Sequence, residues 1–460
     1  MKRKNLTALC VILGCLIVLA LLCGLIFSGK SGLFHKGQNP AETQKNPAES
    51  TQPDVGNTGN IKTFSCITVT VGKNPATDVN ITWNSLESEN GYVEISDNNF
   101  AEGSIIKVNA IAENTTFQIP AEGQFDYKAP VLNEVSGSIF RAYITGLTPG
   151  KTYNYRVGDG KKYSENYTFT TASDDNNYSF LLISDTQGFT KRNFDVFGNV
   201  IKTATASHPD ANLIVHMGDA VEEGKNLYQW QTYFDSASGI MENHTVVNVV
   251  GNKDKKHTLA HYTCGAQENR TALVSGYYSF EIGSIHFAVL NTGDGDKDIP
   301  KSQLKWLESD LAAANDKHVI ILIHKAPYSD ANHCNDAEIL AIRSQIMPIA
   351  TKYNVPLVIE GHDHYYFRSK PVSCVENSGN LNISENTENG TVYFMNGSAG
   401  CRQHDGNILS PEGVLTAKSE ILTSPTYSYV TVTDNRIDFK TYYVNTTGSE
   451  TLLEAFGIEW

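Results

Sequence analysis

Short, largely apolar runs separated by longer amphipathic stretches fill the sequence after Asp174, and they constrain the fold more than any other feature. Such short runs are typical of buried strands, and the stretches between them are long enough to form helices. The clearest predicted helix covers residues 302–315, and a second covers residues 336–353. The runs themselves are 179–183, 213–215, 246–250, 285–290, 319–323 and 356–359. Buried strands alternating with helices predict an α/β sheet that is covered on both faces.

The segment before this region, residues 61–173, has a different pattern, in which apolar and polar residues alternate. Residues 67–71, 79–83 and 92–95 follow this period of two, and Gly, Pro, Asn and Asp separate the runs. Several short strands at such spacing are typical of a β-sandwich. We therefore expect an all-β domain over residues 61–173, an α/β domain over residues 174–445 and a C-terminal tail over residues 446–460.

The N-terminus predicts a membrane segment. A basic flank at residues 1–4 precedes a nearly continuous apolar run over residues 8–28. About 20 apolar residues suffice to cross a bilayer, and the basic flank favours a cytoplasmic N-terminus. We expect residues 1–28 to form a transmembrane helix that serves as an anchor; a cleaved signal peptide is the alternative, although its apolar core is usually shorter. Residues 29–60 contain scarcely any large apolar side chain, which predicts a flexible linker.

The charge of the chain argues against one large class of partner. Its 36 Lys and Arg residues and 50 Asp and Glu residues give a formal net charge of −14. The sequence has no long basic run beyond its first few residues, so we expect neither nucleic acid nor an anionic membrane surface as the main partner. Phosphate esters remain compatible with this charge, because metal cations can invert the local field at a site.

The cysteines do not form a metal-binding pattern. Three of the eight lie in the apolar N-terminal run, and the other five include no Cys-x-x-Cys pair. This argues against a zinc finger. One or two disulfides are compatible with an oxidising compartment, but the spacing does not reveal their pairing.

Polar side chains follow five of the predicted strands at the point where each strand ends. They are Asp185 with Gln187, Asp219, Asn252, His324, and His362 with His364. In open α/β sheets, ligands bind outside the carboxyl ends of the strands. Oxygen donors mixed with imidazoles are a ligand set that suits Mn, Fe or Zn, in contrast to a soft site made of thiolates. One such strand end would be an ordinary turn, whereas five in chain order predict a metal site.

In their order, these motifs resemble those of the calcineurin-like metallophosphoesterase superfamily, and within it the purple-acid-phosphatase-like branch. The family order is Asp-x-His or a variant, Gly-Asp, Gly-Asn-His, His and Gly-His-x-His; the chain has Asp185, Gly218-Asp219, Gly251-Asn252, His324 and Gly361-His362-Asp363-His364. Residues 140–157 are similar to the end of a fibronectin type III domain and to the N-terminal domain of purple acid phosphatases; an unrelated β-sandwich is the alternative. The resemblance covers about residues 61–445. It implies an α/β (α+β) metallophosphoesterase four-layer sandwich preceded by an all-β, fibronectin type III-like sandwich.

The resemblance also implies two metal ions, divalent or of mixed valence, drawn from Fe, Mn and Zn. One ion would be bound by Asp185, Asp219 and His364, with Gln187 as a further ligand. The other would be bound by Asp219, Asn252, His324 and His362, so that the Asp219 carboxylate bridges the pair. In this family the metal ions generate a hydroxide that attacks phosphorus in line. The residues that the resemblance implies to be catalytic are Lys253 and His324.

Three positions depart from the family pattern. Gln187 replaces the His of Asp-x-His, and Glu222 replaces the Tyr of Gly-Asp-x-x-Tyr whose charge transfer to iron gives purple acid phosphatases their colour, so we expect no purple colour. Lys253 replaces the His of Gly-Asn-His, which contacts phosphate and is thought to protonate the leaving group. A lysine can keep the phosphate contact as a point charge but is a poorer general acid. The histidines that could substitute for it are His257, His261 and His333.

The expected function is metal-dependent hydrolysis of phosphate esters, acid-phosphatase-like and directed at monoesters. A phosphodiesterase is one alternative. Others are a surface binding protein on a catalytically weakened phosphatase scaffold and an adhesion module in which the β-sandwich is the working part. The expected substrate is a phosphorylated small molecule or surface group, with no nucleic acid partner and with membrane contact through the N-terminal segment. The expected location is extracytoplasmic, either membrane-anchored at the cell surface or secreted; the sequence does not determine the oligomeric state.

Overall fold

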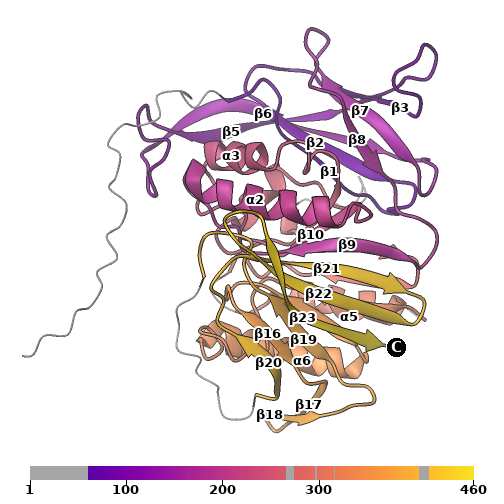
Figure 1. The fold of residues 1–460 in the computed structure, drawn as a ribbon, viewed down its shortest axis with the longest axis vertical. Coiled ribbons are helices and arrows are strands. Elements are labelled where there is room, and N and C mark those ends of the chain that lie inside the picture. The colour runs from indigo at the N-terminus through magenta and orange to yellow at the C-terminus, as the bar shows by residue number, and fades with distance from the viewer. Residues whose placement is uncertain (1–60, 266–273, 296–297, 315, 404–413) are drawn as a thin grey trace, which may run out of the picture. The chain divides into compact units, whose positions relative to one another are not determined.

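A computed structural model describes residues 61–265, 274–295, 298–314, 316–403 and 414–460, all of which belong to one compact unit (Figure 1). The expected anchor over residues 1–28 and the expected linker over residues 29–60 lie outside the described residues. Within the described ranges, no helix has the length and apolar character needed to cross a membrane.

The N-terminal part of this unit is all-β, as its alternating pattern predicts. One row of strands consists of β1 (Ser65–Val71), β2 (Val79–Ser85), β6 (Leu132–Ile144) and β5 (Ile111–Pro120). A second sheet has the order β4 (Ile106–Asn109), β3 (Tyr92–Ser96), β7 (Thr152–Gly158) and β8 (Tyr167–Thr170). Apolar side chains of both sheets form a buried core in which the rings of Trp83 and Phe140 stack with centroids 5.2 Å apart.

Strand β1 also joins the β-domain to the α/β domain. It pairs in parallel with β11 (Thr245–Asn248), with Val69 opposite Thr245. A single ten-stranded sheet therefore runs through both parts in the order β23-β22-β21-β9-β10-β11-β1-β2-β6-β5. Its remaining strands are β9 (Tyr178–Ile183), β10 (Leu213–His216), β21 (Thr426–Thr433), β22 (Arg436–Val444) and β23 (Glu450–Glu459). The hydroxyl of Tyr155 on β7 adds a second link by donating to the backbone carbonyl of Glu242 across 2.7 Å.

A seven-stranded sheet forms the other half of the α/β domain. Its order is β12 (Tyr278–Ile282), β13 (Ile285–Val289), β14 (His318–Leu322), β15 (Leu357–Glu360), β19 (Val392–Asn396), β16 (Tyr366–Ser369) and β20 (Thr416–Glu420). A separate hairpin consists of β17 (Val372–Asn377) and β18 (Asn380–Glu385). Side chains of β14 alternate: Ile320 and Leu322 enter the core shared with the ten-stranded sheet, and Val319 and Ile321 face the other core. Both faces are buried, which explains the continuous apolar run.

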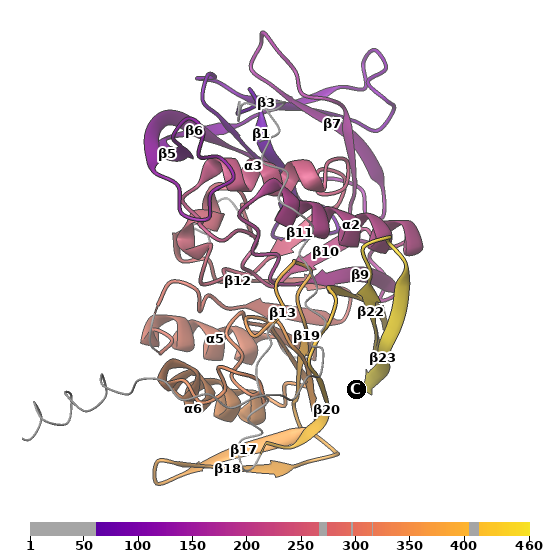
Figure 2. The same ribbon diagram turned by 60° about the vertical axis from the view of Figure 1, so that its left-hand side comes forward.

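Helices cover both large sheets. α2 (Lys191–Ser207) and α3 (Leu227–Ser236) pack on the ten-stranded sheet, and a short 3-10 helix, η1 (Lys255–Ala260), follows β11. α5 (Lys301–Ala313) and α6 (Ala337–Lys352) pack on the seven-stranded sheet (Figure 2). Their side chains Leu307, Leu311 and Ile346 are buried. Both helices predicted from the sequence are present, with ends that differ from the expected ones by one or two residues.

The prediction of a C-terminal tail over residues 446–460 is wrong. Residues Glu450–Glu459 form strand β23, which pairs antiparallel with β22 at the edge of the ten-stranded sheet. The ring of Phe456 stacks on Phe439 with centroids 4.8 Å apart and lies 5.0 Å from Phe394. The segment is ordered because it buries these aromatic contacts against the core, which a solvated tail would not do.

The cysteines of the described ranges are all free thiols. Cys66, Cys264, Cys334 and Cys374 are buried, and Cys401 is exposed. No disulfide is therefore formed among these five residues.

Candidate metal site

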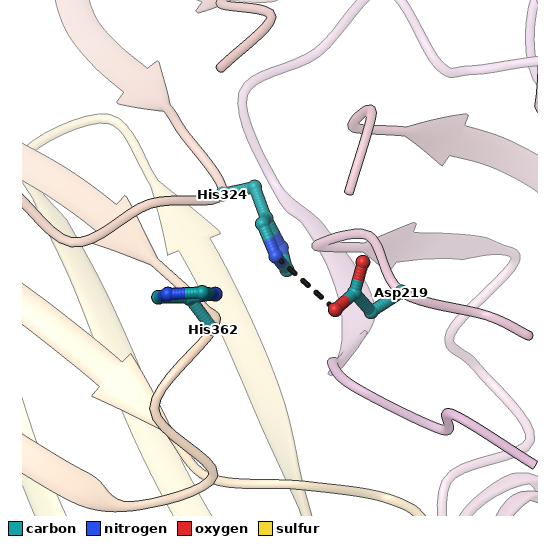
Figure 3. A group of neighbouring side chains, drawn as sticks. All are labelled: Asp219, His324 and His362. Carbon is teal, nitrogen blue, oxygen red and sulfur yellow. Dashed lines mark ion pairs between the residues drawn. The ribbon is translucent and has the colours of Figure 1, made fainter. Parts of the chain in front are cut away.

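The predicted ligands converge where the carboxyl ends of strands from the two large sheets meet. Asp185, Asp219 and Asn252 come from the loops after β9, β10 and β11 of the ten-stranded sheet. The histidines come from the loops after β14 and β15 of the seven-stranded sheet. Figure 3 shows the imidazoles of His324 and His362 beside the carboxylate of Asp219. The site is thus assembled from two sheets, each of which supplies a different kind of ligand.

One group of ligand atoms surrounds the side-chain oxygen of Asn252. This oxygen is 2.9 Å from Nε2 of His324 and 2.8 Å from Nδ1 of His362. Nε2 of His324 is also 3.5 Å from Oδ2 of Asp219. Ligand atoms of Asp219, His324 and His362 all lie within 4.8 Å of one another, close enough to bind one metal ion. The other ring nitrogen of His324 lies 2.8 Å from the carbonyl of Met217, a contact that turns Nε2 towards the group.

A second group contains Asp185 and His364. Oδ1 of Asp185 is 3.5 Å from Nε2 of His364 and has no hydrogen-bond partner among the described residues, although it is fully buried. The other oxygen, Oδ2, accepts from the backbone N–H of His362 across 3.0 Å and from the hydroxyl of Ser184. Burying a carboxylate oxygen without a partner is costly, so Oδ1 fits a position that a metal ion would occupy. The donor set therefore fits the metal ions that the family implies.

Gln187 lies beside these groups but is held by another residue. Its amide nitrogen is 2.9 Å from Oε2 of Glu222, the residue that replaces the family tyrosine. An amide nitrogen does not bind a metal ion, so the contact leaves Oε1 as the only atom of Gln187 that could be a ligand. The two departures from the family pattern at positions 187 and 222 are thus in direct contact with each other.

Glu222 also contacts two cations, one of which the sequence analysis did not identify. Nζ of Lys253 is 3.9 Å from Oε1, and Nη1 of Arg402 is 3.0 Å from Oε2. The backbone carbonyl of Arg402 lies 3.0 Å from Nδ1 of His364, so this residue also supports a predicted ligand. Arg402 follows the Gly397–Gly400 loop after β19. The position of that loop after a buried strand is the sequence signal that could have identified it.

The three histidines considered as substitutes for the missing family histidine lie in different places. The ring of His333 lies 4.6 Å from that of His362, and its Nδ1 is 2.7 Å from Asp336. His261 is buried against Trp230 and contacts the side-chain amide of Asn84, which indicates a structural role. His257 is half-buried in η1. Of the three, only His333 contacts a predicted ligand through a described interaction.

The backbone at the site adopts a conformation that side chains disfavour. Of the eleven non-glycine residues with positive φ among those described, five are predicted ligands: Asp185, Gln187, Asp219, His362 and His364. Positive φ costs free energy for such residues and concentrates at functional sites. Gly251 is required for a different reason, because a Cβ there would clash with the backbone nitrogen and Oδ1 of Asp219. The fold thus maintains strained loops that direct these side chains towards one region.

The ionisable groups of the site perturb one another strongly. Burial raises the pKa of Asp185 to about 7, and the Asp219 carboxylate adds to this effect. Burial also opposes charge on Asp219 and His324, but the attraction between the two outweighs it. The pKa of Asp219 falls to about 2 and that of His324 rises to about 9. Burial, together with the positive charge of His324, lowers the pKa of His362 well below its usual range, which favours the neutral form that binds metal ions. A metal ion at His324 must displace its proton.

Comparisons with known proteins agree with this arrangement. Residues 65–171 match the purple acid phosphatase N-terminal domain, and residues 178–366 match the calcineurin-like phosphoesterases. The chain is 25% identical over 360 residues to purple acid phosphatase 13 of Arabidopsis thaliana, covering 65% of this chain and 63% of that protein. It is 23% identical to the probable inactive purple acid phosphatase 9 of the same plant, covering 70% of this chain and 54% of that protein. The chain therefore spans less than two thirds of the length of these relatives.

A solved structure shows the same fold. The purple acid phosphatase PPD1 from yellow lupin (Lupinus luteus) seeds superposes with a TM-score of 0.67 at 17% identity, covering 86% of this chain and 74% of that one. The resemblance inferred from the strand-end motifs is thereby confirmed. The chain thus combines a region that matches the purple acid phosphatase N-terminal domain with a region that matches the calcineurin-like phosphoesterases, on a fold that it shares with a purple acid phosphatase.

Proposed function

We propose that the chain is a metal-dependent phosphate-ester hydrolase that acts on monoesters in the manner of an acid phosphatase. The observation that carries this proposal is the convergence of five loops on one region, where the buried Oδ1 of Asp185 lacks a hydrogen-bond partner among the described residues. No structural requirement explains why so many polar groups should be buried together there. The match of residues 178–366 to the calcineurin-like phosphoesterases supports the same reaction class.

Two metal ions would be held by the residues already described. Asp185 and His364 would hold one ion, with Gln187 as a further ligand through Oε1. Asn252, His324 and His362 would hold the other, and Asp219 would contribute to both. Such ions, drawn from Fe, Mn or Zn, supply positive charge that lowers the pKa of a bound water and neutralises a phosphoryl group.

Two side chains at the edge of the site would act on the substrate. Lys253 replaces the phosphate-contacting histidine and would bind a phosphate oxygen as a point charge. His333 lies against His362, and histidine is the side chain that most often acts as a general acid or base. We therefore assign protonation of the leaving group to His333 and phosphate binding to Lys253.

The test is an assay of the full chain, purified in detergent, stripped of metal and reloaded with Mn, Zn or Fe. The substrates are an aryl phosphate monoester and a bis-aryl phosphodiester. Asp219→Asn should abolish turnover and lower the metal content, whereas the matched control Asp195→Asn, on an exposed face of α2, should change neither. If the chain binds no metal and hydrolyses neither ester, it is not a hydrolase of this class.

The alternative functions make different predictions in the same assay. Faster turnover of the diester than of the monoester would favour a phosphodiesterase. Metal and phosphate binding without turnover would favour a catalytically weakened binding protein, an alternative motivated by Lys253, by Glu222 and by the similarity to a probable inactive purple acid phosphatase.

We further propose that the site faces the outside of the cell membrane, with residues 1–28 as anchor or signal peptide. The basic residues 1–4 and the apolar run that follows them support this orientation. Protease added to intact cells should degrade the domains of residues 61–460. Protection of these domains in intact cells, with cleavage only after lysis, would contradict the proposed location.

A further inference from the structure

Glu222 lies at the centre of a small charged cluster at the edge of the site. Its side chain is 13% exposed. Its carboxylate oxygens lie 3.0 Å from Nη1 of Arg402, 2.9 Å from Nε2 of Gln187 and 3.9 Å from Nζ of Lys253. The two cations come from loops after different strands, β19 and β11. One carboxylate therefore faces two positively charged side chains, which leaves a surplus of positive charge at the edge of the site.

The two cations meet at Glu222, and the backbone of each contacts a different predicted ligand. The backbone carbonyl of Arg402 lies 3.0 Å from Nδ1 of His364, which places Arg402 at the end of the site that contains Asp185. The backbone N–H of Lys253 donates to Oδ1 of Asp219 across 2.7 Å, next to the group around Asn252. A phosphoryl group bound between the predicted ligands would therefore lie within reach of both cations.

Contacts with the described residues leave donors of the Arg402 guanidinium for a ligand. Arginine carries five N–H donors, and the described contact with Glu222 uses only Nη1. About a third of the Arg402 side chain, 32%, is exposed. The planar fork of a guanidinium matches the oxygen spacing of phosphate, whereas the ammonium of Lys253 contributes a point charge.

We propose that Arg402, held by Glu222, is a substrate-binding residue that contacts phosphate oxygens. Together with Lys253 it makes the site prefer the dianion of a phosphate monoester to the monoanion of a diester. The inference rests on the proposed function, because it concerns the substrate of the same site. A second negative charge on the substrate balances the surplus positive charge, and a monoester offers one more unsubstituted oxygen than a diester does.

The test compares Arg402→Met and Arg402→Lys in the metal-loaded full chain. The matched control is Arg156→Met on β7, because Arg156 is also a partly exposed arginine paired with one carboxylate, Glu94, at 2.7 Å. Arg402→Met should lower kcat/KM for the aryl monoester by about 10- to 100-fold and that for the diester by less than about 5-fold. Arg402→Lys should fall between the wild type and Arg402→Met, and the control should leave both values unchanged.

Metal content and inorganic phosphate binding make the result decisive. Calorimetry should show that Arg402→Met binds inorganic phosphate about 10-fold more weakly than the wild type, with an unchanged metal content. Loss of metal in Arg402→Met would overturn the proposal, because the side chain would then be needed to hold the backbone carbonyl of Arg402 against the metal ligand His364. Equal losses on both esters, or no loss on either, would also overturn it. If the wild type hydrolyses neither ester, the proposed reaction fails, and phosphate calorimetry alone decides the role of Arg402.

Discussion

The backbone N–H of Lys253 donates to Oδ1 of Asp219 across 2.7 Å. Position 253 therefore supports the central carboxylate of the site through its main chain, whichever side chain it carries. The departure from the family pattern at this position concerns what contacts the substrate and leaves the backbone support of the ligands in place.

Lys253→His should consequently retain the metal and increase monoesterase activity. Restoring an imidazole adds a general acid whose pKa lies near neutral pH, and we expect a gain of about 3- to 10-fold in kcat for the aryl monoester. Metal analysis of the purified variant provides the control. Unchanged or lower activity with full metal content would show that the lysine itself contributes to turnover.

Asp185→Asn should have opposite effects on the metal-free and the metal-loaded protein. In the metal-free protein the buried carboxylate has an oxygen without a hydrogen-bond partner among the described residues. Burial raises the pKa of this carboxyl to about 7, so its charge destabilises the fold at pH 8. Removing that charge should raise the melting temperature of the metal-free protein at pH 8 by a few degrees, and Mn or Zn should then stabilise the variant less than the wild type. Thermal unfolding with and without metal measures both effects. A variant that is stabilised by metal as strongly as the wild type would exclude Asp185 as a ligand.

Most of the site could be predicted from the sequence because its ligands are local features of strand ends. Asp185, Asp219 and Asn252 each follow a buried strand, and parallel strands deliver such residues to the same edge of a sheet. Arg402 also lies in a loop after a buried strand, but that position does not show which side chains it contacts. Its contacts with Glu222 and His364 join residues 180 and 38 positions apart, a proximity that only the tertiary fold creates.

The fold shows the same division between local and tertiary information. The six apolar runs predicted β9, β10, β11, β13, β14 and β15, since each run overlaps one of these strands. Two other features depend instead on contacts between distant segments: the parallel pairing of β1 with β11, and the formation of strand β23 by the C-terminal residues. Phe456 illustrates this, because its partners Phe394 and Phe439 belong to other strands and no local pattern links the three rings.

Glu242 should make stability depend on pH at the junction between the β-domain and the α/β domain. Burial raises the pKa of its carboxyl to about 7 from an ordinary value of 4.5. The folded protein therefore binds the proton more tightly than the unfolded chain does. The stability that the folded state gains from the protonated Glu242 carboxyl is present in full below pH 4.5 and is lost as the pH rises through 7. Glu242→Gln removes the charge that is buried at high pH. The change that it causes in the free energy of unfolding should therefore be more favourable at pH 8 than at pH 4, by about 2 kcal/mol. Denaturant unfolding at the two pH values tests this, and an equal effect at both would rule out ionisation as the cause.

Phe456→Ala should destabilise the protein, because β23 is an integral part of the ten-stranded sheet. The Phe456 ring stacks on that of Phe439 with centroids 4.8 Å apart, and Cζ of Arg368 lies over the Phe456 ring, 4.7 Å from its centroid. The ring is half-buried, so we expect a loss of about 2 kcal/mol in the free energy of unfolding, less than for a fully buried phenylalanine. Leu452→Ala is the matched control in the same strand: its side chain is 51% exposed, and its loss should stay below about 0.5 kcal/mol. Equal, small losses for both variants would indicate that β23 contributes little to the stability of the sheet, as expected of a loosely attached tail.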